Sequence, residues 1–545
     1  MWPPGSTRED QRQRRPHPGG VPTQSGERRH KLHRVFLWII AYLAFSTFLV
    51  GAAWPYLSNF PPVSADEVWI MSASYKVATQ GILGSDLFVG FHGSDKHYFL
   101  NLPVHHFVQA AFFKVFGPGI AQARAPSLLA AVSVLCAVGW LAYKWVGLGC
   151  SVATGILLLF WRSNLIAVDP RPPLLALAQS ARYDVMVLSF WWLAVLMLNR
   201  HLGQPRRATA IAVGLLAGIT ALTQFYGAGV LICCAAALLW TKRQVRSRVL
   251  YGREVAIGAL IPLLGYGTYI AAHWTDFIGQ AALRSYRLRF YDPRFLLTNL
   301  LNEPHRFDWL LNASRDVIGR WTVALAIPLA LLAVVRLFRR GNFLPLMSTV
   351  GAFLSLALLD SIKATIYASL LVPVLCFGVA VALTPTVSSW PHRLWAVLRA
   401  VTAWAFLFWI IVDGVGGYEF VSVEGPRVTR YGDVGRQIAN AIEPQGMVFG
   451  SQRWWWALHT FPYRSLNAQW EIWEDEQLSN RTPDFSHMLD KFGGAYLIFD
   501  NDIRGDLTRV PSQLRQQVND VLSSRAALVG VWRDRTYGLI EIYWF

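Results

Sequence analysis

The sequence Ser64-Ala65-Asp66-Glu67-Val68-Trp69 places two adjacent carboxylates shortly after the first long apolar run, which extends from Val35 to Ala53. That run is long enough to cross a bilayer. A helix bundle does not need two carboxylates beside a membrane exit to hold together. We therefore interpret Asp66 as a candidate catalytic base at the membrane surface. The alternative is an acidic first turn of a surface helix, and the pair alone does not decide between them.

The composition is that of a membrane protein. The chain has 545 residues, of which 54% are hydrophobic and only 15% are charged. Apolar runs of roughly 17–25 residues recur along it, as spanning helices require. An ordinary soluble enzyme is therefore excluded. The pattern predicts an α-helical polytopic membrane protein with about eleven transmembrane helices within residues 35–412.

The charges are unevenly distributed. From Asp413 to the end there are 13 Lys and Arg against 17 Asp and Glu, whereas the rest of the chain has 37 against 16. Most of the basic excess lies in short loops between apolar runs, where the positive-inside rule explains it. Nucleic acid binding is not indicated. The rule predicts a multi-pass protein of the cell membrane with a cytoplasmic N-terminus.

This orientation divides the chain into parts. Residues 1–34 are polar and basic and are predicted to be a disordered cytoplasmic tail. The loops at 55–123 and 273–315 are predicted to be external, and residues 102–116 within the first of them to form an interfacial helix. Residues 413–545 contain short apolar runs typical of strands. We expect them to form a small extracytoplasmic α/β domain.

Several charged residues on the predicted outer side are not explained by topology. A single Arg at the end of a span commonly extends to lipid headgroups. Several cations near two carboxylates suggest instead a site for the phosphate of a lipid-linked donor, since Arg binds phosphate bidentately. The candidate phosphate-binding residues are Arg124, Arg182, Lys363, Arg284 and Arg287.

Six segments resemble those of a known superfamily in order and spacing. They are Asp66-Glu67, Leu102-Pro103-Val104-His105-His106, Phe113-Lys114-Val115-Phe116-Gly117, Ala123-Arg124-Ala125-Pro126-Ser127-Leu128-Leu129, Ala181-Arg182-Tyr183-Asp184 and the segment from Lys363 to Tyr367. Over roughly residues 35–385 the chain resembles the superfamily of protein O-mannosyltransferases and lipid A aminoarabinose transferases. The resemblance implies a C-type glycosyltransferase (GT-C) fold and a polyprenyl-phosphate sugar donor.

The resemblance also implies roles for individual residues. Asp66 would be the base or the group that orients the acceptor, and Glu67 would support it or share its role. Asp184 would contact the acceptor or a neighbouring catalytic group. These three residues are the candidate catalytic residues. Transfer would take place on the outer side of the membrane, usually with inversion at the sugar.

We therefore predict a membrane glycosyltransferase that moves a sugar from a polyprenyl-phosphate carrier to a hydroxyl of a glycan, lipid or protein acceptor. Two alternatives remain: a transporter or flippase of a lipid-linked glycan, and a non-catalytic envelope assembly protein. A transporter would place ionisable groups near mid-membrane, whereas here they lie at the ends of spans. The histidines have irregular spacing, so the sequence indicates no metal or other cofactor, and a divalent metal stays an open alternative.

Overall fold

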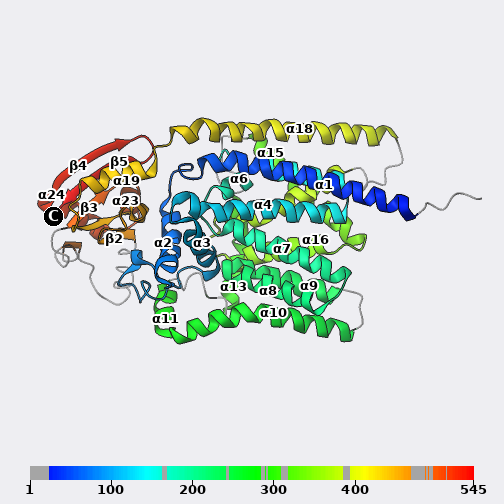
Figure 1. Cartoon of the computed structure of the whole chain (residues 1–545), viewed down its shortest axis with the longest axis horizontal. Coiled ribbons are helices and arrows are strands. Elements are labelled where there is room, and N and C mark those ends of the chain that lie inside the picture. Colours follow the sequence, from blue (N-terminus) through cyan, green and yellow to red (C-terminus); the bar gives the residue numbers. More distant parts are fainter. Residues whose placement is uncertain are drawn as a thin grey trace, which may run out of the picture.

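The computed structural model shows an elongated molecule with a bundle of long helices and a small sheet-containing domain at one end (Figure 1). The structure describes residues 24–162, 169–240, 245–283, 289, 292–308, 317–384, 393–467, 485–486, 489, 495–510 and 512–545. The bundle helices run roughly along the long axis of the molecule. Helix α1 begins at the end opposite the sheet-containing domain.

In the part of the chain that the structure describes, long helices form the bundle predicted for residues 35–412. These helices are α1 (Gln24–Ala53), α4 (Ile120–Trp145), α5 (Leu148–Phe160), α7 (Asp184–Gly203), α8 (Arg207–Thr223), α9 (Gly229–Trp240), α10 (Val245–Ala272), α15 (Val317–Arg339), α16 (Leu344–Leu359), α17 (Val372–Leu383) and α18 (Arg393–Glu424). Within the described residues, six helical segments are long and apolar enough to cross a membrane, and four apolar helices are shorter. The chain is a membrane protein, but the predicted count of about eleven spans is not confirmed.

Two predicted boundaries fall inside helices. Helix α1 begins at Gln24, so residues 24–34, predicted as part of the disordered tail, are helical. The other residues of that predicted tail lie outside the described residues. Helix α18 extends to Glu424, beyond the boundary predicted at residue 412.

Short helices lie across the end of the bundle that carries the sheet (Figure 1). They are α2 (Ala65–Gln80), α3 (Pro103–Phe116), α6 (Pro173–Ala178), α11 (Trp274–Leu283) and α13 (Pro293–Leu301). Helix α3 confirms the helix predicted for residues 102–116. Helix α2 begins with a capping box between Ser64 and Glu67, and it ends at Gly81, whose φ of 73° is the left-handed conformation that glycine favours.

The C-terminal domain is built on one five-stranded sheet with strand order β2-β1-β3-β5-β4. Its strands are β1 (Met447–Gly450), β2 (Tyr463–Ser465), β3 (Ala495–Phe499), β4 (Ala527–Asp534) and β5 (Gly538–Trp544), and its helices are α19 (Tyr431–Asn440), α20 (Trp455–Leu458), α23 (Asn501–Leu507) and α24 (Ser512–Arg525). Strands β2, β1 and β3 are parallel, whereas β5 pairs antiparallel with β3 and β4. The predicted α/β character is confirmed.

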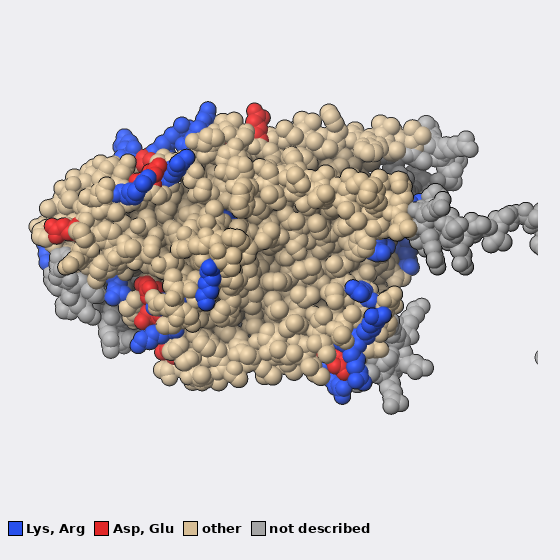
Figure 2. Space-filling view, viewed as in Figure 1, with Lys and Arg blue, Asp and Glu red and all other residues tan. Residues whose placement is uncertain are grey.

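Charged side chains gather at the two ends of the molecule in the view of Figure 2, and few lie on the band between them. The end that carries the C-terminal domain shows both signs of charge. Apolar side chains such as Leu43, Leu264 and Phe408 are exposed on the bundle. A surface of this kind fits the hydrocarbon layer of a bilayer.

Helices α8 and α10 approach each other closely because small residues lie between them. A Cβ atom at Gly258 would overlap the carbonyl oxygen of Ile211, and one at Gly214 would overlap that of Val255. Small residues allow the backbones of membrane helices to touch in this way, since lipid provides little hydrophobic drive for helix association.

We predict that Gly258→Ala destabilises the protein by about 1–3 kcal/mol, the usual range for overpacking, because it forces α8 and α10 apart. Gly265→Ala on the same helix is the matched control, since a Cβ there meets no atom within 4 Å. Thermal unfolding in detergent measures both variants. Equal melting temperatures for the two would contradict this packing.

Candidate active site

Glu67 and Arg124 form a buried ion pair between the start of α2 and the start of α4. The guanidinium donates from Nε to Oε1 at 2.8 Å and from Nη2 to Oε2 at 2.7 Å. The Glu67 side chain also accepts hydrogen bonds from the backbone N–H groups of Ser64 at 3.2 Å and Ala181 at 2.7 Å. Glu67 is 2% exposed and Arg124 is 0% exposed. Both carboxylate oxygens of Glu67 are therefore fully engaged.

The surroundings of Glu67 stabilise the negative charge of its carboxylate. Burial by itself raises the pKa of the Glu67 carboxyl, but Arg124 and the two backbone donors outweigh burial, and the pKa is lowered. Arg124 also donates to the carbonyl oxygens of Leu57 at 3.1 Å and Pro61 at 2.9 Å. This one guanidinium therefore joins α2, α4 and the segment that leaves α1.

A second set of charges surrounds Arg182, directly before α7. Its Nη1 donates to Oδ2 of Asp66 at 2.6 Å, and its Nε donates to Oδ2 of Asp184 at 2.9 Å. The Asp66 side chain is 60% exposed, whereas that of Asp184 is fully buried. Asp184 also accepts a hydrogen bond from the hydroxyl of Tyr226 at 2.8 Å. The Arg182 guanidinium thus links a buried acid to an exposed one.

The surroundings of Arg182 keep it charged. Burial alone lowers the pKa of its guanidinium, but Asp184, Tyr183 and Asp66 together raise that pKa well above its ordinary value. In the described part of the chain, Nη2 of Arg182 donates to no residue. This nitrogen is therefore committed to neither of the two ion pairs.

Lys363 belongs to a different buried cluster. Its Nζ donates to Glu303 at 2.8 Å and to the carbonyl oxygen of Ala357 at 2.9 Å. Arg306 binds the same Glu303 at 2.7 Å and Asp360 at 2.8 Å. The positive charges of Lys363 and Arg306 are therefore neutralised by the negative charges of Glu303 and Asp360.

Tyrosine rings connect this second cluster to Asp184. Tyr367, four residues after Lys363, has its hydroxyl 3.4 Å from that of Tyr183 and its ring 5.0 Å from that of Tyr226. Tyr226 is the residue that donates to Asp184. The Lys363 segment therefore packs beside the Arg182 cluster through aromatic side chains.

Two buried histidines lie next to the charged groups. His105 is 1% exposed, and neither of its ring nitrogens has a partner among the described residues. Its ring centroid is 6.3 Å from that of Tyr183, the neighbour of Arg182. The Nδ1 atom of His106 lies 3.2 Å from the hydroxyl of Ser74. Burial lowers the pKa of His105 to about 3 and that of His106 to about 4.

The structure brings together some of the predicted site residues and separates others. Asp66, Arg182 and Asp184 form one cluster, and Glu67 pairs with Arg124 beside it. Lys363 lies in the second cluster. The candidates Arg284 and Arg287 lie outside the described residues. The described residues contain no group of three or more His, Cys, Asp or Glu that could hold a metal, and the absence of a cofactor stays a prediction.

Four residues of these clusters were not singled out from the sequence: Tyr226, Glu303, Arg306 and Asp360. Glu303 and Arg306 carry a weak signal, because acid and base at i and i+3 can pair on one helical turn. Tyr226 carries no signal of its own in the sequence.

Comparisons with solved structures identify the fold. ArnT from Cupriavidus metallidurans in the apo state matches with a TM-score of 0.57 and 17% identity, over 94% of this chain and 98% of that chain. The same protein bound to undecaprenyl phosphate matches with a TM-score of 0.55 and 18% identity, over 94% of this chain and 97% of that chain. The oligosaccharyltransferase of Archaeoglobus fulgidus in the apo form matches with a TM-score of 0.52 and 11% identity, over 86% of this chain and 69% of that chain. No family model and no curated protein matches the chain.

The chain therefore has the C-type glycosyltransferase fold, as the resemblance in its sequence implied. The likeness to ArnT extends over almost the whole of both chains, including the part with the C-terminal sheet. At these identities the comparison establishes the fold, and the chemistry has to be argued from the site.

We predict that Arg124→Met destabilises the protein by about 3–5 kcal/mol, because it leaves the Glu67 carboxylate buried and unpaired. The double variant Glu67→Gln/Arg124→Met should recover part of that loss, since no buried charge remains. Thermal unfolding in detergent compares the double variant with the single variants Arg124→Met and Glu67→Gln. If the double variant is destabilised by the sum of the two single changes, the ion pair is not the stabilising contact.

The buried histidines predict a decline of stability in weak acid. Unfolded histidines bind protons near their ordinary pKa of 6.5, whereas folded His105 and His106 do so only at about 3 and 4. The contribution of these two histidines to stability is therefore complete above about pH 6.5 and falls as the pH decreases below it, by up to about 1.4 kcal/mol per unit and histidine.

His105→Gln should lower the slope of stability against pH between about 6.5 and 4.5 by up to about 1.4 kcal/mol per pH unit, the contribution of one histidine. The pH window lies above that in which Glu67 protonates, because the pKa of Glu67 is lowered from 4.5. His33→Gln, at an exposed position on α1, is the control. An unchanged slope in His105→Gln would show that His105 is not held neutral by the fold.

Proposed function

We propose that this protein is a membrane glycosyltransferase that moves a sugar from a polyprenyl-phosphate carrier to a hydroxyl of its acceptor. The observation that carries the proposal is the Arg182 guanidinium, which binds the exposed Asp66 and the buried Asp184 at one end of the helical bundle. This arrangement offers a carboxylate to the acceptor and a cation to the carrier phosphate. The GT-C fold supports it, since ArnT, which shares this fold, was solved with undecaprenyl phosphate bound.

In the proposed reaction, the acceptor hydroxyl attacks the anomeric carbon of the sugar and transfers its proton to Asp66. The bond between the anomeric carbon and the phosphate oxygen breaks, and its electrons remain on the polyprenyl phosphate. General base catalysis of this kind contributes about 10²–10⁴-fold to the rate. We propose that Nη2 of Arg182 binds the leaving phosphate as its negative charge grows.

The other residues act through these groups. Asp184 and Tyr226 orient Arg182. Glu67 is a positioning residue rather than a second base, because both of its oxygens are engaged by Arg124 and backbone donors. Arg124 is also a positioning residue, since all three of its guanidinium nitrogens already donate hydrogen bonds.

The remaining phosphate candidates stay proposals. Lys363 is already paired with Glu303, so we propose that it reaches a phosphate only after a rearrangement of its cluster. Arg284 and Arg287 are proposed as further contacts to the donor on the grounds of their charge.

We also propose that the site faces the extracytoplasmic side of the cell membrane, with the N-terminus in the cytoplasm. Helix α1 begins at the end of the bundle opposite the C-terminal domain (Figure 1), and the residues before it carry a basic excess. The positive-inside rule places such residues in the cytoplasm. Asp184 opens α7 and Glu67 lies in the first turn of α2, so both are at helix ends. Transporters place such groups near mid-membrane, and the enzyme is therefore favoured.

We predict that Asp66→Asn folds normally but lowers kcat by about 10²–10⁴-fold, because the acceptor proton loses its base. The assay measures release of polyprenyl phosphate from labelled polyprenyl-phosphate hexoses and pentoses. Asp520→Asn, at an exposed position on α24, is the control. Wild-type kcat in Asp66→Asn would exclude Asp66 as the base.

Arg182→Ala should instead weaken the binding of polyprenyl phosphate about 10–100-fold, the usual cost of a lost hydrogen bond to a charged group. Binding of polyprenyl phosphate alone to the purified protein measures this effect without an acceptor. Unchanged affinity would remove Arg182 from the donor site.

A further inference from the structure

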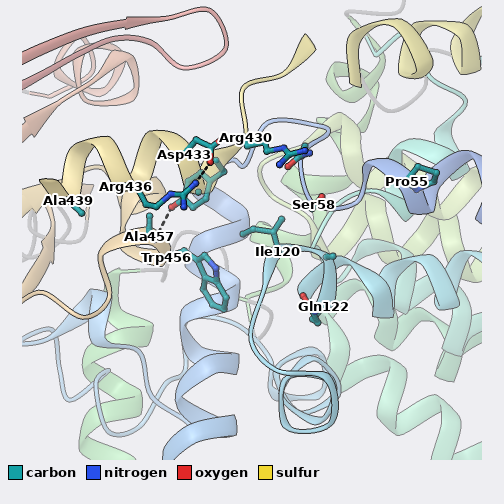
Figure 3. Close-up of a pocket in the computed structure, with 14 residues that line it drawn as sticks. Pro55, Ser58, Ile120, Gln122, Arg430, Asp433, Arg436, Ala439, Trp456 and Ala457 are labelled. Carbon is teal, nitrogen blue, oxygen red and sulfur yellow. Dashed lines mark hydrogen bonds and ion pairs between the residues drawn. The ribbon is translucent and has the colours of Figure 1, made fainter. Parts of the chain in front are cut away.

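A groove of about 900 Å³ opens between the helical bundle and the C-terminal domain (Figure 3). One wall comes from the segment that leaves α1, with Ser58 and Asn59, and from the start of α4, with Gln122. The other wall comes from α19 and α20 of the C-terminal domain. Its volume lies in the range of ligand-binding pockets.

The lining of the groove combines polar and apolar side chains with one large aromatic surface. Arg430 is exposed, and in Figure 3 its side chain extends from the α19 side toward the segment of Ser58. Arg436 is paired with Asp433. The indole of Trp456 is partly buried between Tyr75 and Phe113, at centroid distances of 5.7 Å and 5.4 Å.

This chemistry fits a saccharide better than a lipid tail or a peptide. Amide, hydroxyl and guanidinium groups match the hydroxyls of sugars, and an indole offers an apolar body with a polar edge. A lipid tail would need a continuous apolar lining, whereas Ser58, Asn59 and Gln122 interrupt the apolar residues of this wall. An extended peptide would add to the edge of a sheet, whereas helices and turns line this groove.

The same contacts that hold the candidate active site also shape the groove. Arg124 donates to the carbonyl oxygens of Leu57 and Pro61, which flank Ser58 and Asn59, while it binds Glu67. One wall of the groove is therefore fixed by the guanidinium that fixes the first turn of α2.

Apolar packing provides a second link. Ile120 and Trp456, which both line the groove, pack in one cluster with Met71 and Ala181. Ala181 directly precedes Arg182 in the chain. Asp66, Arg182 and Asp184 do not themselves line the groove, but its lining packs against the residue that directly precedes Arg182.

We propose that the groove binds the acceptor and that the acceptor is a saccharide, held with the hydroxyl that reacts toward Asp66. This inference rests on the proposed function, because it names the substrate class of the same enzyme. It gives the C-terminal domain a role in binding, since α19 and α20 supply half of the groove.

The test uses the full-length protein in detergent and an immobilised array of mannose-, glucose- and galactose-based oligosaccharides. Wild type should bind at least one of these probes. Arg430→Ala and Asn59→Ala should each weaken that binding about tenfold or more, as the loss of hydrogen bonds in a binding site does. Arg427→Ala, an exposed arginine three residues from Arg430 that does not line the groove, should bind like wild type.

Binding of polyprenyl phosphate, measured on the same preparations, separates this inference from the proposed function. All three variants should retain it, because they leave Asp66, Arg182 and Asp184 unchanged. The inference is overturned if wild type binds none of the saccharides, or if Arg430→Ala and Asn59→Ala bind as tightly as wild type. If wild type does not bind polyprenyl phosphate, that result would instead count against the proposed function.

Discussion

The buried ion pair between Glu67 and Arg124 is the contact on which this end of the molecule depends. It joins the first turn of α2 to α4, and its hydrogen bonds extend to Leu57, Pro61 and Ala181. These backbone positions are far apart in the sequence. A buried charge left without its partner costs several kcal/mol, so no part of this network can move alone. The pair therefore fixes where Asp66 and Arg182 stand.

Adjacent carboxylates in one helical turn have opposite environments here. Successive residues of an α-helix point about 100° apart, so Glu67 faces the interior while Asp66 faces outward. Their exposures differ accordingly, with 60% for the Asp66 side chain and 3% for that of Glu67. The buried acid builds the site, and the exposed acid is available for chemistry. The capping box confirms that the Asp-Glu pair lies at a helix start, and its role in a functional site stays a proposal.

The sequence predicted the fold more fully than the site. Long apolar runs indicated the bundle helices, and motif order indicated the GT-C fold. The pairing of Arg182 with Asp184 could be predicted from the sequence, because the two residues are close in the chain. Burial could not be predicted in the same way, so Arg124 could not be recognised as the partner of Glu67, 57 residues away. For the same reason the cluster of Lys363 with Glu303 was missed, since their contact depends on how α13 packs against α16.

The most direct measurement is an experimental structure of this protein with polyprenyl phosphate bound. Our account predicts that the phosphate lies within hydrogen-bond distance of Nη2 of Arg182, with Asp66 lining the same cavity and the Glu67–Arg124 pair intact. A phosphate bound at another place on the chain, with Asp66 in open solvent away from it, would contradict the account.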